Sequence, residues 1–262
     1  MTTAIVYTVP GMDDVQVHAN RRYRPDEDST LLLDAYVPSG LARSDRRPVV
    51  LLVHGGVAPG VLAKDWPLFQ TWGRLLAASG FVGITFNHRL GFPKANLVQA
   101  GADVRAAIAH ARDNAEALNV DRDRVCLLGF SAGGPLLGTG LGPDTEFVRC
   151  MVAFYAFLDI RRSPLHADEG PPELLRQYSP AAFYGEAGAK VPPIFVARAG
   201  LDAAPLNAII DQFVAGALKA NAPLTVMNHP QGKHGFDALN DDDRSREIIR
   251  AVLAFMHTHL GD

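Results

Sequence analysis

The chain has 262 residues, of which 48% are hydrophobic and 20% charged, and its 25 basic and 28 acidic side chains give a formal net charge of −3. A chain of this length buries roughly three quarters of its unfolded surface, which excludes an intrinsically disordered protein. The nearly balanced charge provides no electrostatic attraction to nucleic acid or to anionic lipid. We therefore expect neither nucleic-acid nor membrane binding.

Two features predict a soluble, cytoplasmic protein. Residues 1–14 lack a basic start and a sustained apolar stretch, and no apolar segment approaches the roughly 18 residues that span a bilayer. Cys126 and Cys150 each lie in an apolar run, and one cysteine pair in so long a chain is not a disulfide framework. We expect both thiols to be reduced and buried. The composition is compatible with a homodimer but does not predict one.

Short apolar runs predict strands along the whole chain. The first two, Val15–Asn20 and Leu31–Val37, flank the polar stretch 21–30, which is typical of an antiparallel pair. The later runs are apolar on both faces, as parallel strands covered by helices require. These later runs are Pro48–Val53, Phe81–Phe86, Val125–Leu128, Arg149–Phe157, Pro193–Ala197 and, more weakly, Leu224–Met227.

Helical periodicity fills most of the segments between these strands, with apolar faces over 68–76, 104–118, 206–218 and 248–260. Alternating strands and helices predict an α/β fold, with an open, mostly parallel sheet covered by helices on both faces. We expect one domain over residues 1–262. The stretch 160–191 does not fit the alternation, because it is rich in proline, and it is expected to form a small cap-like excursion.

The strongest motif is Gly129-Phe130-Ser131-Ala132-Gly133, which follows the predicted strand Val125–Leu128 and precedes a helical stretch of small residues. A serine held on a tight strand-to-helix turn is exposed as a nucleophile, and small residues two before and two after it let the backbone pass. The N-terminus of the following helix directs backbone N–H groups, that of Ala132 among them, toward developing negative charge. A turn of the same sequence without chemistry is the alternative.

A second motif, His54-Gly55-Gly56, ends the strand Pro48–Val53. Glycines at this point let a backbone N–H approach a bound carbonyl oxygen and serve as the second donor of an oxyanion hole. Gly55, Gly56 and Val57 are the candidates for that donor. For His54 itself, a local hydrogen-bonding role is preferred to a catalytic one.

A serine nucleophile needs a base and a carboxylate that orients the base. Of the nine histidines, His234 has the best surroundings, a glycine-flanked loop before the last helix, and His229 in the same loop is the weaker candidate. Asp202 follows the strand Pro193–Ala197, and Asp159 follows the preceding strand in the same way. The chain order Ser, acid, His accommodates either carboxylate, and Asp202 is preferred for its loop position.

Together these residues resemble the α/β-hydrolase superfamily. The segments Gly200-Leu201-Asp202 and Gly232 to Phe236 are similar to the acid and histidine loops of small esterases related to dienelactone hydrolases and to the acetyl/feruloyl esterase-like group. The resemblance implies a catalytic triad of Ser131, Asp202 and His234. Dienelactone hydrolases themselves carry a cysteine nucleophile, whereas Ser131 occupies that position here.

The expected function is hydrolysis of carboxylic esters, with short acyl or aryl groups, through an acyl-enzyme. A peptidase, lactonase or acyltransferase with the same triad, and a non-catalytic ligand-binding protein of the same fold, are the alternatives. No cofactor is expected, and no metal, because the sequence shows no cluster of His, Cys and carboxylates at ligand spacing. The candidate substrate-pocket residues are Phe130, Tyr178, Phe183 and Tyr184, with Arg161 and Arg162 as further candidates for substrate contact.

Overall fold

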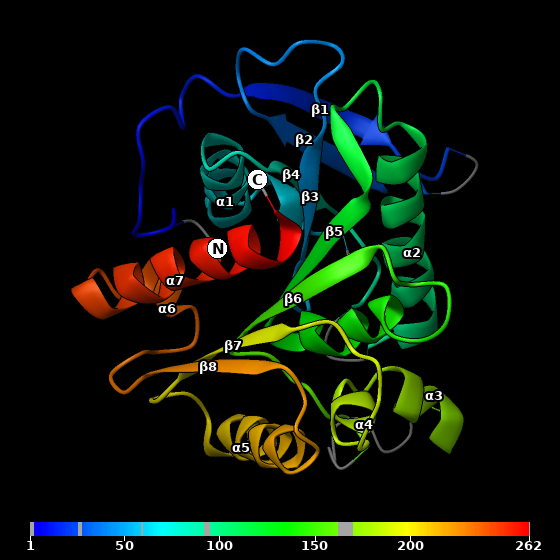
Figure 1. Cartoon of the computed structure of the whole chain (residues 1–262), viewed down its shortest axis with the longest axis vertical. Helices are drawn as coiled ribbons and strands as arrows, with labels where there is room; N and C mark the ends of the chain where they lie inside the picture. The colour runs from blue at the N-terminus through cyan, green and yellow to red at the C-terminus, as the bar shows by residue number, and fades with distance from the viewer. Residues whose placement is uncertain (1–2, 26–27, 59, 92–94, 162–169, 262) are drawn as a thin grey trace.

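The computed structural model describes residues 3–25, 28–58, 60–91, 95–161 and 170–261. The strands that it contains form one sheet at the centre of the molecule (Figure 1). They are β1 (Gln16–Arg22), β2 (Leu32–Val37), β3 (Arg47–Val53), β4 (Val82–Phe86), β5 (Val120–Phe130), β6 (Val148–Phe154), β7 (Ile194–Ala199) and β8 (Leu224–His229).

The eight strands lie in the order β1-β2-β4-β3-β5-β6-β7-β8. β2 is antiparallel to both β1 and β4, and every other neighbouring pair is parallel. The predicted α/β fold, a mostly parallel sheet with an N-terminal antiparallel pair, is therefore confirmed. The insertion of β4 between β2 and β3 has no signal in the local sequence pattern, because it depends on how the connections cross the sheet.

Helices connect the strands and cover both faces of the sheet, as predicted. The two 3₁₀ segments are η1 (Ala63–Asp65) and η2 (Ser131–Gly140). The α-helices are α1 (Pro67–Ala78), α2 (Leu97–Asp113), α3 (Pro172–Gln177), α4 (Ala181–Tyr184), α5 (Ala204–Lys219), α6 (Phe236–Leu239) and α7 (Asp243–Leu260). In Figure 1, α1 and α7 lie on one side of the sheet and α2 lies on the other.

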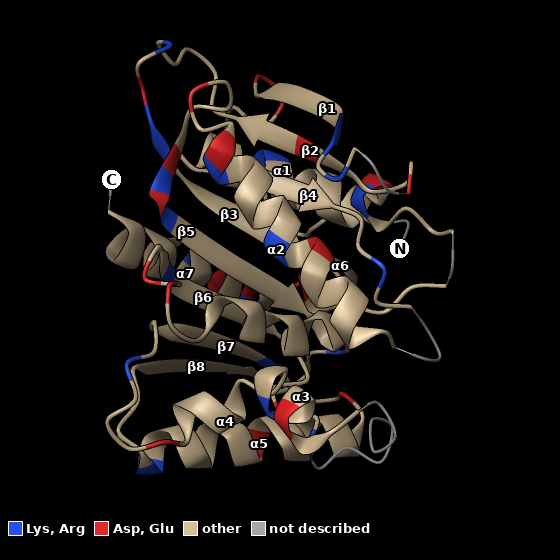
Figure 2. Cartoon of the chain, turned by 90° about the vertical axis from the view of Figure 1, so that its right-hand side faces the viewer, with Lys and Arg blue, Asp and Glu red and all other residues tan. Residues whose placement is uncertain are grey.

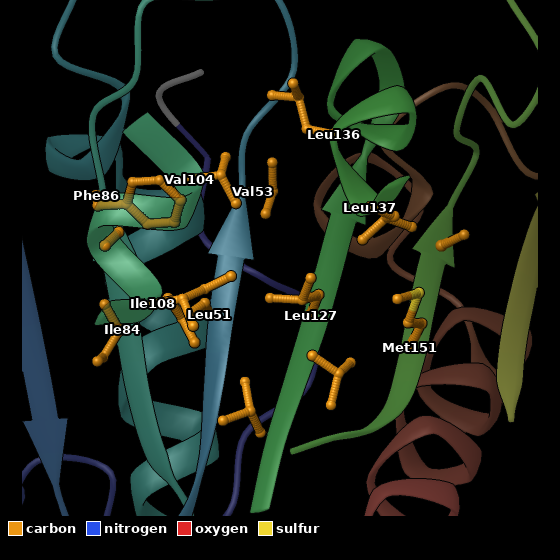
Figure 3. Packing of buried hydrophobic residues seen from close by; sticks show 14 of the residues in the cluster. Leu51, Val53, Ile84, Phe86, Val104, Ile108, Leu127, Leu136, Leu137 and Met151 are labelled. Carbon is orange, nitrogen blue, oxygen red and sulfur yellow. The ribbon is translucent and has the colours of Figure 1, made fainter. Parts of the chain in front are cut away.

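The hydrophobic core has two parts, one on each face of the sheet. On the first face, Val104 and Ile108 of α2 pack over Leu51 and Ile84 of the central strands, and Leu127 lies beside them (Figure 3). On the second face, the apolar sides of α1 and α7 cover the alternate strand residues. Helix α2 lies in front of the central strands in Figure 2, where charged residues are concentrated on helices, in loops and at the beginning of β5. The two-sided burial of the central strands follows directly from their apolar sequence.

The predicted excursion over 160–191 contains α3 and α4, and residues 162–169 lie outside the described part of the chain. Helices α3 and α4 lie on the same side of the sheet as α2 (Figure 1). Tyr178 and Tyr184 from this segment are buried in the core on that face. The segment therefore contributes to the hydrophobic core.

Two further sequence predictions concern the cysteines and membrane-spanning segments. Cys126 of β5 and Cys150 of β6 are both free and buried, as predicted. In the parts of the chain that the structure describes, no helix is both long enough and apolar enough to cross a membrane.

The candidate site residues lie at one edge of the sheet. Ser131 follows β5, Asp202 lies three residues after the end of β7, and His234 lies five residues after the end of β8. Because β5 to β8 are parallel, their carboxyl ends open on the same edge, which is where ligand sites form in open α/β sheets.

Candidate active site

Ser131 directly follows β5 and is the first residue of η2, on a strained turn. Its φ of 52° is in the left-handed region, which non-glycine residues rarely adopt. The turn is possible because Gly133 has no side chain: a Cβ added there would lie 2.5 Å from the backbone oxygens of Val53 and His54. The elbow therefore packs directly against the end of β3. This contact explains why the motif needs a glycine two residues after the serine.

The structure brings Ser131, His234 and Asp202 together. The Nε2 atom of His234 lies 2.9 Å from the Oγ of Ser131, and its Nδ1 atom lies 2.6 Å from an oxygen of Asp202. The side chain of His234 is 41% exposed, whereas that of Asp202 is 6% exposed. The second oxygen of Asp202 accepts a hydrogen bond from the backbone N–H of Ala203 at 2.7 Å. The histidine is therefore accessible to a substrate, and the carboxylate behind it is fixed.

The hydrogen bonds of His234 define its tautomer. A carboxylate only accepts hydrogen bonds, so Nδ1 of His234 carries the proton toward Asp202. Nε2 then presents a lone pair to the hydroxyl of Ser131. This arrangement can remove the serine proton during attack on a carbonyl carbon and can hold that proton on the imidazole.

The two competing residues are engaged elsewhere. Both carboxylate oxygens of Asp159 accept hydrogen bonds from the Arg161 guanidinium, at 2.9 and 2.8 Å. His229 is buried, with its Nε2 within 3.1 Å of Asp242 and Ser245. In the part of the chain that the structure describes, neither side chain is hydrogen-bonded to Ser131 or His234, and the preference for Asp202 and His234 agrees with this geometry.

The Gly55–Val57 turn lies beside the elbow. A Cβ added at Gly55 would lie 3.1 Å from Cβ and 3.5 Å from Oγ of Ser131. The carbonyl oxygen of Gly55 accepts a hydrogen bond from Nδ1 of His54 at 2.6 Å, so this carbonyl is turned toward the His54 ring. In a trans peptide the following N–H, that of Gly56, points the opposite way. The contact with His54 therefore fixes the direction of the Gly56 N–H, in a turn that lies next to Ser131.

His54 is a structural residue, in agreement with the preferred interpretation of the sequence. Its ring stacks on that of His88 with centroids 3.6 Å apart, and its Nε2 accepts a hydrogen bond from the His88 backbone N–H at 3.3 Å. Nε2 of His88 donates in turn to the backbone oxygen of His54 at 3.2 Å. Burial lowers the pKa of His54 to about 4 and the pKa of His88 well below its usual value. Both rings are therefore neutral near pH 7.

The predicted pocket residues lie mainly in the core. Phe130, Tyr178 and Tyr184 are each 2% exposed or less, and Phe183 is partly buried with the Arg176 guanidinium over its ring. Side chains this deeply buried have no surface to offer a substrate, so the pocket expectation is wrong for Phe130, Tyr178 and Tyr184. The prediction differs from the structure because aromatic residues occur both in pocket walls and in hydrophobic cores, and the sequence alone does not distinguish the two.

The two arginines predicted to contact substrate have different outcomes. Arg161 is engaged by Asp159. Arg162 lies outside the described residues.

A pocket of about 230 Å³ opens between the loops that follow β3 and β4. Val57 of the turn beside Ser131 forms part of its wall, together with Leu31, Leu62, Asn87 and His88. These residues carried no sequence signal for a pocket, because their proximity depends on the adjacent positions of β3 and β4. Among the described residues, no group of three or more His, Cys, Asp and Glu side chains is arranged to hold a metal ion.

Comparison with known proteins supports the fold. The family model BD-FAE matches residues 33–143. Solved structures of Thermogutta terrifontis esterase 2 superimpose over nearly the whole chain. The propionate-bound form has a TM-score of 0.71 and 22% identity, and the form phosphonylated by sarin has a TM-score of 0.73 and 19% identity. Each match covers 97% of this chain and 98% of the solved one.

Curated relatives are similar over part of the chain. A secreted lipase of Arthroderma benhamiae is 32% identical over 146 residues, which are 48% of this chain and 28% of the lipase. The non-reducing polyketide synthase ausA of Aspergillus calidoustus is 31% identical over 151 residues, 53% of this chain and 6% of the synthase. The chain thus spans less than a third of the length of these relatives.

The sheet order, the strand-to-helix elbow and the structural matches define the α/β-hydrolase fold. The chain therefore has the α/β-hydrolase fold, and its residues 33–143 match the BD-FAE family model.

Proposed function

We propose that this protein hydrolyses carboxylic esters through an acyl-enzyme, with Ser131 as nucleophile, His234 as general base and Asp202 as the carboxylate that orients His234. One observation carries the proposal: His234 lies within hydrogen-bonding distance of both partners, 2.9 Å from Ser131 and 2.6 Å from Asp202. The match to BD-FAE, a family of acetyl and feruloyl esterases, supports the same reaction class.

In the first step, the Oγ atom of Ser131 attacks the ester carbonyl carbon while Nε2 of His234 takes the hydroxyl proton. The carbonyl oxygen becomes negatively charged in the tetrahedral intermediate. Backbone N–H groups of Ala132 and of the Gly55–Val57 turn stabilise that charge, with the N–H of Gly56 favoured by the orientation of the preceding carbonyl. Collapse of the intermediate breaks the ester C–O bond, and His234 returns its proton to the leaving alcohol.

In the second step, water takes the place of the alcohol. His234 removes a proton from that water, which attacks the acyl carbon, and then returns the proton to Oγ of Ser131 as the acid leaves. Asp202 stabilises the imidazolium in both steps without itself taking the proton. The net reaction converts an ester and water into an acid and an alcohol.

The acyl group is proposed to be short. The proposed acyl site is the pocket that Val57 lines; its wall includes none of the three triad residues, and Val57 links it to the turn beside Ser131. Its volume, about 230 Å³, is smaller than the roughly 300–1,000 Å³ of clefts that hold drug-sized ligands. Solved structures of Thermogutta terrifontis esterase 2 include propionate-bound and butyrate-bound forms. Acetyl to butyryl esters, and small aryl acyl esters, are therefore the proposed substrates.

The test is hydrolysis of p-nitrophenyl acetate, butyrate and octanoate by the wild type and by Ser131→Ala. We expect turnover of the two short esters and a loss of roughly 10⁴-fold in kcat for the variant, as removal of a triad nucleophile causes elsewhere. Ser79→Ala, at the end of α1 and on the opposite edge of the sheet, is the matched control and should retain full activity. Equal activity of Ser131→Ala and the wild type would overturn the proposal.

Acyl transfer is the second candidate function. The same acyl-enzyme can pass its acyl group to an alcohol acceptor instead of water, and several matched curated proteins are named non-reducing polyketide synthases. Adding an alcohol acceptor to the p-nitrophenyl butyrate assay separates the two reactions. A new ester as the main product would favour transfer, and butyric acid as the main product would favour hydrolysis.

A further inference from the structure

Backbone strain marks a second residue at the site besides Ser131. Among the described residues, six non-glycine residues have a positive φ, and four of them are Asn or Asp, which tolerate this region. The remaining two are Ser131, with φ 52°, and Tyr155, with φ 38°. Such strain in a bulky residue persists only where its surroundings hold it, and it is concentrated at functional sites.

Two hydrogen bonds hold Tyr155 directly after the end of β6. Its backbone N–H donates to the oxygen of Ala197 at 2.8 Å, and its hydroxyl donates to one oxygen of Asp237 at 2.7 Å. The other oxygen of Asp237 accepts a hydrogen bond from Trp72 Nε1 at 2.8 Å. Tyr155 is 2% exposed and Asp237 is fully buried. The phenol is thus fixed by a carboxylate that is itself fixed on both oxygens.

The burial of Asp237 in α6 carries an energetic cost. A buried carboxylate is costly unless it is hydrogen-bonded, and two apolar residues would fill the same space without that cost. Burial raises the pKa of Asp237, while the hydrogen bonds from Trp72 and Tyr155 oppose that rise. Burial and the nearby Asp237 raise the pKa of the Tyr155 hydroxyl well above its usual value, so the phenol keeps its proton for Asp237.

The ring of Tyr155 lies against the imidazole of His234. Their centroids are 4.6 Å apart and their planes are inclined by 56°. The side chain of His234 is 41% exposed, so only part of the imidazole is in contact with other residues of the protein. The face of an aromatic ring carries partial negative charge and favours a cation next to it. The imidazolium formed during ester cleavage is such a cation.

We propose that Tyr155, held by Asp237, is a positioning residue that keeps the His234 imidazole aligned between Ser131 and Asp202 and stabilises its protonated form. The inference rests on the proposed function, since it assigns Tyr155 a role in that reaction. It also predicts that the Tyr155–Asp237 pair acts in the catalytic step and contributes little to substrate binding.

The test compares Tyr155→Phe, Asp237→Asn and the double variant in p-nitrophenyl butyrate hydrolysis. We expect each single variant to lower kcat by about ten-fold, the upper range for one hydrogen bond, with KM within about two-fold of the wild type. The double variant should be no slower than the slower single variant, because both changes break the same contact. Tyr184→Phe is the matched control: it removes the hydroxyl of another fully buried tyrosine, which donates to the Pro192 oxygen in the core, and should leave kcat unchanged.

Circular dichroism and thermal unfolding establish that each variant is folded at the assay temperature. If Tyr155→Phe does not fold, the kinetics of Asp237→Asn alone test the inference, because this variant leaves the tyrosine in place. A folded variant with kcat within two-fold of the wild type would overturn the inference, as would losses that multiply in the double variant or that appear mainly in KM. Ser131→Ala measured in parallel separates the two proposals. If Ser131→Ala is inactive while the Tyr155 and Asp237 variants are unaffected, only this inference fails.

Discussion

The carboxylate of Asp202 lies 2.6 Å from Nδ1 of His234, whereas the carboxylate of Asp159 is occupied by the Arg161 guanidinium. Since both aspartates follow neighbouring strands, this difference favours Asp202 as the orienting carboxylate of the proposed triad. We expect Asp202→Asn to lower kcat by roughly 10⁴-fold, because an amide favours the wrong imidazole tautomer. The measurement is steady-state hydrolysis of p-nitrophenyl acetate.

Asp159→Asn is the matched control for this prediction. It makes the same chemical change in a loop at the same edge of the sheet, and activity should remain within about two-fold of the wild type, as for a residue outside the reacting groups. A larger loss for Asp159→Asn than for Asp202→Asn would reverse the assignment.

Gly133→Ala should disrupt the elbow. The new Cβ would lie 2.5 Å from the backbone oxygens of Val53 and His54, and backbone atoms cannot yield as a flexible side chain can. We expect a loss of about 1–3 kcal/mol in the free energy of unfolding, typical of overpacking, and a severe loss of ester hydrolysis. Urea unfolding followed by circular dichroism, together with the p-nitrophenyl acetate assay, measures both.

Gly216→Ala in α5 is the control substitution. A Cβ at Gly216 has no atom within 4 Å, and alanine is favoured over glycine inside a helix by roughly 0.5–1 kcal/mol. This variant should be slightly more stable than the wild type and fully active. Equal effects of the two substitutions would show that the close packing at Gly133 does not matter.

The buried His54–His88 pair should make the protein less stable in acid. In the unfolded chain each histidine binds a proton below pH 6.5, whereas burial lowers the pKa of folded His54 to about 4 and that of His88 well below 6.5. Between these values the unfolded state holds more protons, so the free energy of unfolding falls as pH decreases from 6.5 toward 4. The slope is about 1.4 kcal/mol per pH unit for each histidine.

Urea unfolding at several pH values between 7 and 5 tests this prediction, with His88→Phe as the comparison. Phenylalanine can stack on His54 but does not titrate, so the slope should fall by the contribution of one histidine, at most about 1.4 kcal/mol per pH unit. His18, His110 and His259, whose pKa values are also lowered, are common to both proteins and cancel in the comparison. An unchanged slope would contradict the assignment.

Lys64→Met should strongly destabilise the fold. Lys64 is 1% exposed, and its ammonium lies 3.1 Å from both oxygens of the buried Asp34 and 2.6 Å from Asp65. Removing it leaves the Asp34 carboxylate buried without its cation, which costs about 3–5 kcal/mol. The measurement is the free energy of unfolding in urea.

Arg43→Met is the surface control for Lys64. Its pair with Glu116 is exposed on both sides, and exposed ion pairs contribute at most about 1 kcal/mol. The double variant Lys64→Met/Asp34→Asn should recover part of the lost stability, because it removes the unpaired charge. A loss for Lys64→Met no greater than that for Arg43→Met would contradict the role given to the buried pair.

Local pattern was sufficient to predict most of the scaffold. The apolar runs from Pro48–Val53 to Pro193–Ala197 each correspond to a strand in the interior of the sheet, because segments that are apolar on both faces suit a sheet covered by helices. The weaker run Leu224–Met227 also forms a strand, β8, which lies at the edge of the sheet and is partly exposed. The glycines of the elbow could also be predicted from the sequence, since the chain must turn tightly around Ser131. The position of β4 between β2 and β3 could not be predicted from the sequence, because it depends on the crossover connections between strands.

The role of aromatic residues could not be predicted from sequence. Tyr178 and Tyr184 were expected in a pocket and lie in the core, whereas Tyr155, which carried no signal, contacts His234. The sequence around a tyrosine does not show whether its side chain lies in the core or contacts the site. The packing of segments that are distant in the sequence decides this. Asp237 and Tyr155 are 82 residues apart in the chain and share a hydrogen bond.

The sequence by itself determined a nearly neutral chain of 262 residues, the alternation of strands and helices, and a serine on a glycine-flanked turn, because each depends on neighbours within a few residues. Tertiary structure alone decided which carboxylate faces His234, where a small pocket opens beside Val57, and that Asp237 lies buried behind Tyr155. Those relationships join the carboxyl ends of separate strands, and only the assembled sheet brings these ends together.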